Sequence, residues 1–355
     1  MVLSDRALNR ALLSRQLLLS RVSRPALDVV EHLVGMQAQE PADPYVGLWT
    51  RLARFDPGEL AAAVASGAAV RLALQRSTIH LVTAADSVVL RTVLQPVLER
   101  QALGMFRTRL GGASLPELAS AARGLVGASP MTFGELGAAL RERWPDADPM
   151  ALGQTARALV PMVQLPPRGV WGRSGRARHG LLDRALGPDP APDGLVPRYL
   201  AAFGPASVAD MQNWSGLTRL AEVADRLLPS LRSFRAADGR ELLDVPSGPL
   251  PAEDVPAPVR FLPQYDNVLL GHADRSRIVP PDAAALFDQD FHWSPVLVDG
   301  LLRACWRVDR KAGRLHVRVA ALTRAERAEV VAEGGALLGL LVPTAADPEV
   351  VLSDR

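Results

Sequence analysis

The sequence predicts a mainly helical α+β fold made of tandem winged-helix units and a β-rich C-terminal region. Short helices followed by two short strands around a basic turn recur along the chain, whereas the residues after about 255 are richer in proline and in strand-like segments. A length of 355 residues is also more than one ordinary core requires. We therefore expect four units, at residues 1–120, 121–190, 191–254 and 255–355.

The clearest copy of this pattern begins at Thr132. The segment TFGELGAALRERWPD has helical spacing of apolar residues and a capping box formed by Thr132 and Glu135. A second helix is predicted in PMALGQTARALVPMV, and QLPPRGVWGRSGRARHGLLD then predicts two short strands around a glycine-rich turn. The turn carries four arginines, which are Arg168, Arg173, Arg176 and Arg178.

A second copy follows in residues 195–245. Helices broken at GPAS and WSGLT are predicted, with Ser207 and Thr218 as N-caps. The segment LRSFRAADGRELLDV then predicts a hairpin that turns at Asp238 and Gly239. Two consecutive copies of one layout favour a tandem array.

A looser copy lies near the start of the chain, and a basic hairpin lies near its end. Helices are predicted in residues 5–19, 24–36 and 57–67, and paired strands in residues 69–83. Towards the C-terminus, CWRVDRKAGRLHVRV alternates apolar and basic positions, as a hairpin does. Its basic side chains include Arg310, Lys311 and Arg314.

The small net charge does not by itself indicate binding to nucleic acid, but the positions of the basic residues do. The formal net charge is +2, and Lys311 is the sole lysine. Genomic base composition could account for the preference for arginine, but arginine is also the better fork for phosphate. Arginines gathered on three turns would neutralise DNA phosphates and release counterions. The alternative is that these are ordinary solvated turns.

Several other classes of function find no support in the sequence. The single cysteine, Cys305, allows no internal disulfide and no cysteine cluster for zinc, and the histidines lack metal spacing. Neither a phosphate-binding loop nor a dinucleotide fingerprint is present. The sequence therefore predicts no metal and no cofactor. With no signal peptide and no apolar run of membrane-spanning length, we expect a cytoplasmic protein.

The segment EHLVGMQAQEPADPYVGLW contains two glutamines, Gln37 and Gln39, two residues apart. Pro41 disfavours helix at Glu40, so the preceding helix should end near Met36. In an extended stretch, residues two apart point to the same side, so both amides could face one spot. The pair alone is weak evidence, because two surface amides would give the same pattern.

Four blocks of the sequence resemble the signature blocks of the bacterial AlkZ-like winged-helix DNA glycosylases. They are LVGMQAQEPADPYVGLWTRL, LQRSTIHLVTAAD, FLPQYDNVLLGHADRSRIVP and VLVDGLLRACWRV, in the order of the family. The resemblance implies a C-shaped basic channel and a catalytic Gln-x-Gln motif, which Gln37 and Gln39 match. It also implies weaker candidates near the site: Thr78, His80, Asp266, Asn267 and Arg275.

The resemblance also implies a chemistry that suits two amides. An N7-alkylated guanine is already cationic, so its glycosidic bond is weakened and the leaving base needs no proton. Amide oxygens can then hold a water against the sugar and stabilise a cationic transition state through positioning and dipole. The Gln-x-Gln branch is associated with bulky alkylated purines and interstrand crosslinks, so we expect double-stranded DNA carrying such damage as the partner.

Some choices stay open on the sequence alone. Asp266 could stabilise cationic charge or cap a turn, and His80 could be a structural histidine. Lys311 is expected on a solvated hairpin turn, protonated at neutral pH, so a Schiff base is disfavoured and water is the expected nucleophile. A non-enzymatic winged-helix DNA binder or regulator is the alternative function, because winged helices often bind DNA without chemistry. We expect a monomer.

Overall fold

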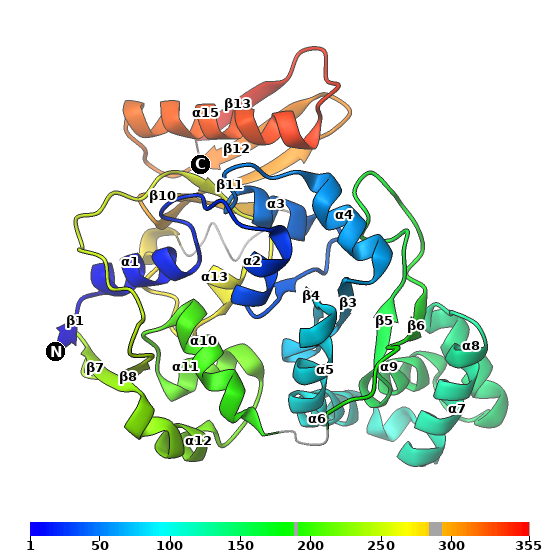
Figure 1. Ribbon diagram of the computed structural model, residues 1–355. Helices are drawn as coiled ribbons and strands as arrows, with labels where there is room; N and C mark the ends of the chain where they lie inside the picture. Colours follow the sequence, from blue (N-terminus) through cyan, green and yellow to red (C-terminus); the bar gives the residue numbers. More distant parts are fainter. Residues whose placement is uncertain (188–190, 284–292, 355) are drawn as a thin grey trace.

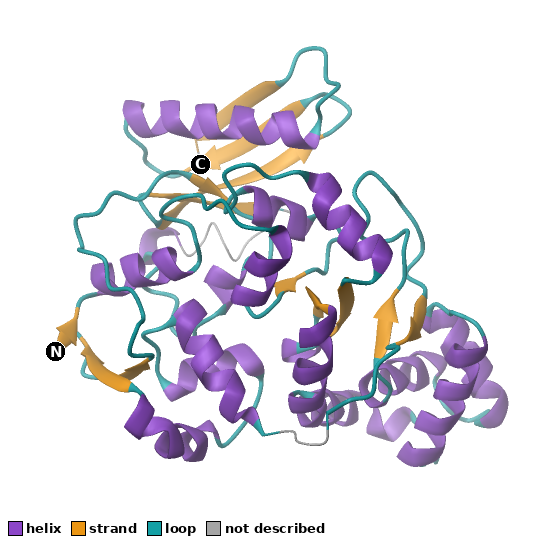
Figure 2. Ribbon diagram, viewed as in Figure 1, coloured by secondary structure: helices purple, strands orange, loops and turns teal. Residues whose placement is uncertain are grey.

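The computed structural model describes residues 1–187, 191–283 and 293–354. It confirms a mixed fold in which many helices surround three small sheets (Figures 1 and 2). No helix in these three stretches is both long and apolar enough to cross a bilayer.

A five-stranded sheet, called the central sheet below, is formed by strands between residues 36 and 181, in the order β2-β4-β3-β5-β6. Its strands are β2 (Met36–Gln37), β3 (Ala69–Ala73), β4 (Ile79–Thr83), β5 (Met162–Gln164) and β6 (His179–Leu181). The predicted strand pair in residues 69–83 is confirmed as the antiparallel pair β3 and β4. Because β3 also pairs with β5, this sheet crosses residue 120, and the division into units at that residue stays a prediction.

Helices precede and follow these strands. They are α1 (Asp5–Arg15), α2 (Ala26–His32), α3 (Asp43–Trp49), α4 (Pro57–Ser66), α5 (Ala84–Val93), α6 (Gln95–Phe106), α7 (Leu115–Ala128), α8 (Phe133–Arg143) and α9 (Pro149–Leu159). The predicted capping box at α8 is present in both directions, with Thr132 accepting from the Glu135 backbone and Glu135 accepting from the Thr132 backbone. The order α8, α9, β5, β6 is the order expected for the first clear copy.

The second copy contains α10 (Leu195–Phe203), α11 (Val208–Ser215), α12 (Leu220–Leu227), β7 (Arg232–Ala236) and β8 (Glu241–Asp244). Ser207 caps α11 as predicted, and β7 and β8 form the predicted hairpin. Thr218 is not the cap of α12, which was a wrong prediction. Arg219 precedes that helix in a left-handed conformation, and the first helical N–H, on Leu220, donates to the Gln212 side chain at 3.1 Å.

The N-terminal strand and the C-terminal region complete the sheets. Strand β1 (Val2–Leu3) pairs in parallel with β7, so the N-terminal residues join the sheet formed by the β7 and β8 hairpin. The C-terminal sheet contains β9 (Arg260–Phe261), β10 (Ser294–Val298), β11 (Leu301–Asp309), β12 (Arg314–Val319) and β13 (Glu349–Asp354). The predicted basic hairpin is β11 and β12. Helix α15 (Arg324–Leu341) covers this sheet (Figure 1).

Short helical turns connect the larger elements. Helix α13 (Asn267–Leu270) is a single turn. The 3₁₀ turns are η1 (Gln75–Ser77), η2 (Arg107–Arg109), η3 (Pro192–Gly194), η4 (Leu228–Ser230) and η5 (Pro281–Ala283).

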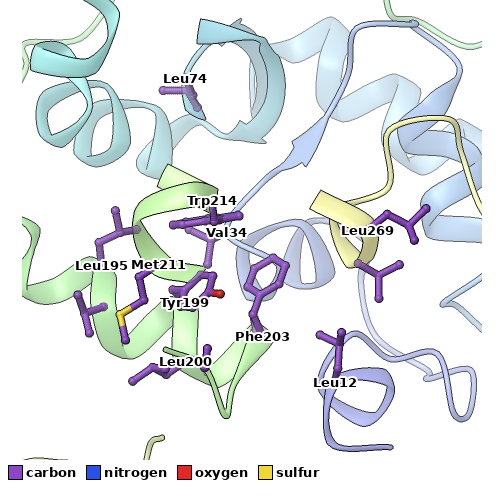
Figure 3. Close-up of a cluster of buried hydrophobic side chains, with 14 of the residues drawn as sticks. Leu12, Val34, Leu74, Leu195, Tyr199, Leu200, Phe203, Met211, Trp214 and Leu269 are labelled. Carbon is purple, nitrogen blue, oxygen red and sulfur yellow. The ribbon is translucent and has the colours of Figure 1, made fainter. Parts of the chain in front are cut away.

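The largest core joins segments from most of the chain. Figure 3 shows Tyr199, Phe203 and Trp214 from α10 and α11 close to Leu12 and Leu269, which come from α1 and α13. The Tyr199 and Phe203 rings are stacked, with centroids 5.0 Å apart. Burial of these rings removes a large apolar area from water and fixes α11 against the central sheet, where the candidate site lies.

Candidate active site

The Gln-x-Gln segment begins where α2 ends. Val34 and Gly35 both have positive φ, and the Gly35 N–H donates to the Val30 carbonyl at 2.9 Å, while the Val34 N–H donates to Glu31. This is the Schellman pattern of helix termination, with an unusual valine in the left-handed position. The helix therefore ends at His32, four residues before the end expected near Met36.

Gly35 is required where the segment enters the sheet. A Cβ at Gly35 would lie 2.6 Å from the Val82 side chain on β4, so the backbone can approach the strand closely only without a side chain. The next residues form β2, in which Met36 pairs with Leu81 and Gln37 with His80. The extended conformation expected for the segment is confirmed at Gln37, where it comes from pairing with β4. Gln39 lies outside the strand, so the expectation that both amides face one spot stays a prediction.

Gln37 is buried and its amide orientation is fixed. Arg76 in η1 donates from Nη2 to Oε1 of Gln37 at 2.9 Å and from Nη1 to the Trp214 carbonyl at 2.8 Å. A guanidinium can only donate, so the atom facing Arg76 must be the amide oxygen. That oxygen keeps one lone pair, and the amide NH₂ points away from Arg76. Gln39 lies two residues later in an exposed bend.

Arg76 stays charged in this position. Burial, and then the charge of Arg275, lower the pKa of Arg76 to about 10, which still leaves it protonated at neutral pH. Both Arg76 and Ser77 have positive φ, and Arg157 holds this strained turn by donating to the Ser77 carbonyl at 3.0 Å. The charge that lowers the pKa of Arg76 thus comes from Arg275, an exposed residue of the third block.

Thr78 and His80 contribute to the structure next to Gln37. The Thr78 hydroxyl donates to the Gln75 carbonyl at 3.1 Å, and the His80 ring nitrogen Nδ1 lies 3.1 Å from the Thr78 carbonyl. Burial, and then Arg76, lower the pKa of His80 to about 3, so its imidazole is neutral at physiological pH. The site therefore gains no positive charge from His80.

Asp266 caps a helix and also pairs with a buried arginine. Its carboxylate accepts from the Val268 N–H at the start of α13, so the expected capping role is present. It also receives two bonds of 2.8 Å from Arg51, and both side chains are almost fully buried. A carboxylate already paired in this way has its charge balanced by Arg51 before any substrate arrives.

Asn267 connects this pair to the glutamine segment. Its Nδ2 donates to the Gly35 carbonyl at 2.7 Å, and its Oδ1 is buried without a partner among the described residues. Gln37, Arg51, Asp266 and Asn267 all line one small cavity of about 10 Å³. The first and third sequence blocks, more than two hundred residues apart, thus meet at Gln37.

Asp43, at the first turn of α3, is a neighbour that the sequence did not indicate. Its Oδ2 is buried without a partner in the described structure. Burial, followed by the charges of Glu40 and Asp266, raises the pKa of Asp43 to about 8, against the opposing effect of Arg71. Asp43 is therefore mostly protonated at neutral pH, four residues after Gln39.

The predicted basic side chains lie on the two expected turns. Arg173 and Arg310, from different turns, line a common cleft. Arg168 donates to the Gly175 carbonyl, Arg176 lies 3.4 Å from Glu135, and Arg314 lies 3.0 Å from Glu349. Lys311 is exposed at the hairpin turn, as expected. Exposed pairs of this kind contribute little to stability, so these arginines can exchange a carboxylate for a phosphate.

Sequence reasoning missed the side chains that hold the glutamine in place. Arg51 and Arg76 both lie inside the blocks LVGMQAQEPADPYVGLWTRL and LQRSTIHLVTAAD, and their place in these blocks was the available signal. Their partners could not be read from the sequence, because Arg51 and Asp266 are 215 positions apart. Among the described residues no group of histidine, cysteine and carboxylate side chains could hold a metal ion.

Comparison with known proteins identifies the family and the fold. The family model described as DNA glycosylase AlkZ-like matches residues 30–340. Among solved structures, the DNA glycosylase AlkZ of Streptomyces sahachiroi is similar, with a TM-score of 0.79 and 20% sequence identity over 99% of this chain and 100% of that chain. At that identity the structural likeness shows a shared fold. No curated protein matches.

Replacement of Asp43 by Asn should change how stability depends on pH. An unfolded aspartate has a pKa of about 3.9, whereas that of folded Asp43 is about 8. Below about pH 3.9 the side chain is protonated in both the folded and the unfolded protein, so it does not change the free energy of unfolding. From there up to about pH 8 only the unfolded protein ionises, and the free energy of unfolding falls by up to about 1.4 kcal/mol per pH unit. Thermal unfolding from pH 4 to 9 should show Asp43→Asn gaining stability over the wild type until about pH 8 and not beyond.

The exposed Asp28 provides the control for this measurement. Asp28→Asn, the same exchange at an exposed position of α2, is measured over the same range to show the effect of the substitution itself. If the difference between Asp43→Asn and the wild type does not change with pH, Asp43 is ionised in the folded protein and the assigned environment is wrong.

Proposed function

The chain belongs to the AlkZ-like DNA glycosylase family, and on this premise we propose that it hydrolyses the N-glycosidic bond of N7-alkylated purines in double-stranded DNA, including bulky adducts and interstrand crosslinks. The family match over residues 30–340 supports a DNA glycosylase. The choice of N7-alkylated purines is our inference from the resemblance to the Gln-x-Gln branch, and the neutral amides support it. The same proposal includes a monomer that acts in the cytoplasm, on the nucleoid.

The neutral amides are the feature that carries the substrate proposal. Gln37 is anchored through its oxygen to Arg76, and Gln39 is exposed two residues later. The neighbouring His80 is neutral. Neither the amides nor the neutral imidazole can protonate a leaving base at neutral pH, which favours a substrate that is already activated. A purine alkylated at N7 meets that condition, because its positive charge weakens the glycosidic bond.

Water is the proposed nucleophile, and the two amides orient it. The free lone pair of the Gln37 oxygen and the Gln39 oxygen would accept hydrogen bonds from the water, which leaves a water lone pair for the anomeric carbon of the sugar. As the glycosidic bond breaks, the alkylated base leaves with the bonding electrons as a neutral molecule, and the proton lost by the water passes to solvent. The amide dipoles also stabilise positive charge that develops on the sugar ring. Undamaged bases are spared, because they are neutral and leave poorly without a proton.

The basic turns would hold the DNA. Arg168, Arg173 and Arg176 belong to one turn and Arg310, Lys311 and Arg314 to the other, and phosphate contacts from both would fix the duplex against the amides. Thr78, Asp266, Asn267 and Arg275 are proposed to shape the site around Gln37 and not to react. In this assignment Asp266 acts through Arg51 and α13.

Replacement of either glutamine tests the proposed function. Gln37→Ala and Gln39→Ala should each slow release of N7-methylguanine from duplex DNA about a hundredfold, with DNA affinity little changed, because a preorganised hydrogen-bonding group is lost. Quantification of released base under single-turnover conditions measures this effect. Gln101→Ala, on α6, is a matched control and should keep the wild-type rate. A double alanine variant that releases base at the wild-type rate would remove the catalytic assignment.

The bond from Arg76 to Gln37 can be tested by a double-mutant cycle. Arg76→Gly removes the guanidinium while tolerating the left-handed backbone, and should slow base release about tenfold. In a Gln37→Ala background the same change should have no further effect, because Arg76 acts through that amide. Additive losses in the double variant would show instead that Arg76 acts independently of Gln37.

The basic turns predict a measurable salt dependence. The pairs Arg173→Ala with Arg176→Ala, and Arg310→Ala with Arg314→Ala, should each weaken DNA binding and reduce the slope of log affinity against log salt by about one per lost phosphate contact. Arg143→Ala is the control, because this exposed arginine lies at the end of α8 beside Glu117. Wild-type slopes in both double variants would exclude these turns as the DNA surface.

A further inference from the structure

A cleft of about 340 Å³ opens directly beside the Gln-x-Gln segment. Pro41 and Ala42, the second and third residues after Gln39, form one edge of it. Successive Cα atoms are about 3.8 Å apart, so this edge lies within about 8 Å of Gln39 along the chain. The cleft has the size of a small-molecule site, at the lower end of the usual range of about 300–1,000 Å³.

The wall of the cleft is aromatic and aliphatic. Trp171, from the turn between β5 and β6, packs against Tyr45 of α3 with ring centroids 4.7 Å apart. The Tyr45 hydroxyl donates to the Gly169 carbonyl at 2.7 Å, so its polar end is already satisfied. Leu340 and Leu341, at the end of α15, contribute aliphatic surface. A flat apolar group in the cleft could stack on the Trp171 ring and pack against the two leucines.

The remaining polar lining is basic. Arg173 and Arg310 both border the cleft, and no carboxylate is among its lining residues. The Arg310 Nη1 donates to the Leu341 carbonyl at 2.6 Å, which holds the hairpin turn at this edge. A ligand that suits this lining is a flat apolar group attached to a polyanion.

We propose that this cleft receives the bulky aromatic or apolar substituent of the alkylated purine and so selects bulky adducts over small ones. The inference rests on the proposed function. With the purine at Gln37 and Gln39, a substituent can reach Trp171 past Pro41, while Arg173 and Arg310 contact the flanking phosphates. Contact with the cleft adds binding free energy that a methyl adduct cannot obtain.

The test compares two substrates. Duplexes carrying a single N7-methylguanine or a single N7-(naphthylmethyl)guanine are given to the wild type and to Trp171→Ala, Trp171→Phe and Leu340→Trp. Trp171→Ala removes the aromatic wall and should lower kcat/KM for the naphthylmethyl adduct about tenfold, mainly through KM, with the methyl adduct changed less than twofold. Trp171→Phe keeps an aromatic ring and should retain most of the preference.

Leu340→Trp fills the cleft and should reject the bulky adduct while sparing the small one, so it tests the cleft without removing the tryptophan. The control is Trp144→Ala, a tryptophan at the end of α8 outside the cleft, which should leave both substrates unchanged. Equal losses on both substrates, or no loss on the bulky one in either cleft variant, would overturn the assignment. If the wild type releases the methylated base but has no preference, only the cleft proposal fails; if it releases neither base, the proposed function fails and the cleft proposal with it.

Discussion

The buried ion pair of Arg51 and Asp266 is the interaction on which the geometry of the site depends. Both side chains are almost fully inaccessible, and Arg51 also donates to the carbonyls of Gln16 and Gly47. Asp266 in turn caps α13, whose first residue, Asn267, binds the Gly35 carbonyl. Removal of one partner would leave an unpaired buried charge, at a cost of about 3–5 kcal/mol. The segment that carries Gln37 is therefore held in place by Asp266 and Asn267, which are far away in the sequence.

Two of the titratable side chains beside Gln37 carry no charge in this arrangement. His80 and Asp43 are both neutral at physiological pH, because burial shifts the pKa of each away from its usual value. Arg76 keeps its charge and donates from one terminal nitrogen to Gln37 and from the other to the Trp214 carbonyl. The amides act through orientation, and Asp43 is a protonated carboxyl beside them whose Oδ2 has no partner among the described residues. In the proposed function, the amides would act on a substrate that is already activated.

Arginine has a structural role in this protein that its abundance alone did not indicate. Arg10, Arg15, Arg51, Arg71 and Arg91 are among the largest fully buried side chains. Several of them donate to backbone carbonyls, as Arg71 does to Ala38 at 2.6 Å. The planar fork with five donors suits this task better than lysine does. Hydrogen bonding inside the protein is thus a third reason for the preference for arginine over lysine, beside phosphate binding and genomic base composition.

The sequence by itself determined the features that depend on neighbouring residues. The capping box of Thr132 and Glu135, the cap at Ser207, the hairpin around Asp238 and Gly239 and the basic hairpin near the C-terminus follow from side chains a few positions apart. The blocks around Gln37 also indicated the family. The end of α2 and the cap of α12 were misplaced, because left-handed residues at Val34 and Arg219 are not encoded by the usual glycine. Only the tertiary structure decided which groups surround Gln37, since the pairings of Arg76 with Trp214 and of Arg51 with Asp266 join residues 138 and 215 positions apart. Such contacts form only when the whole chain packs, so no local pattern could reveal them.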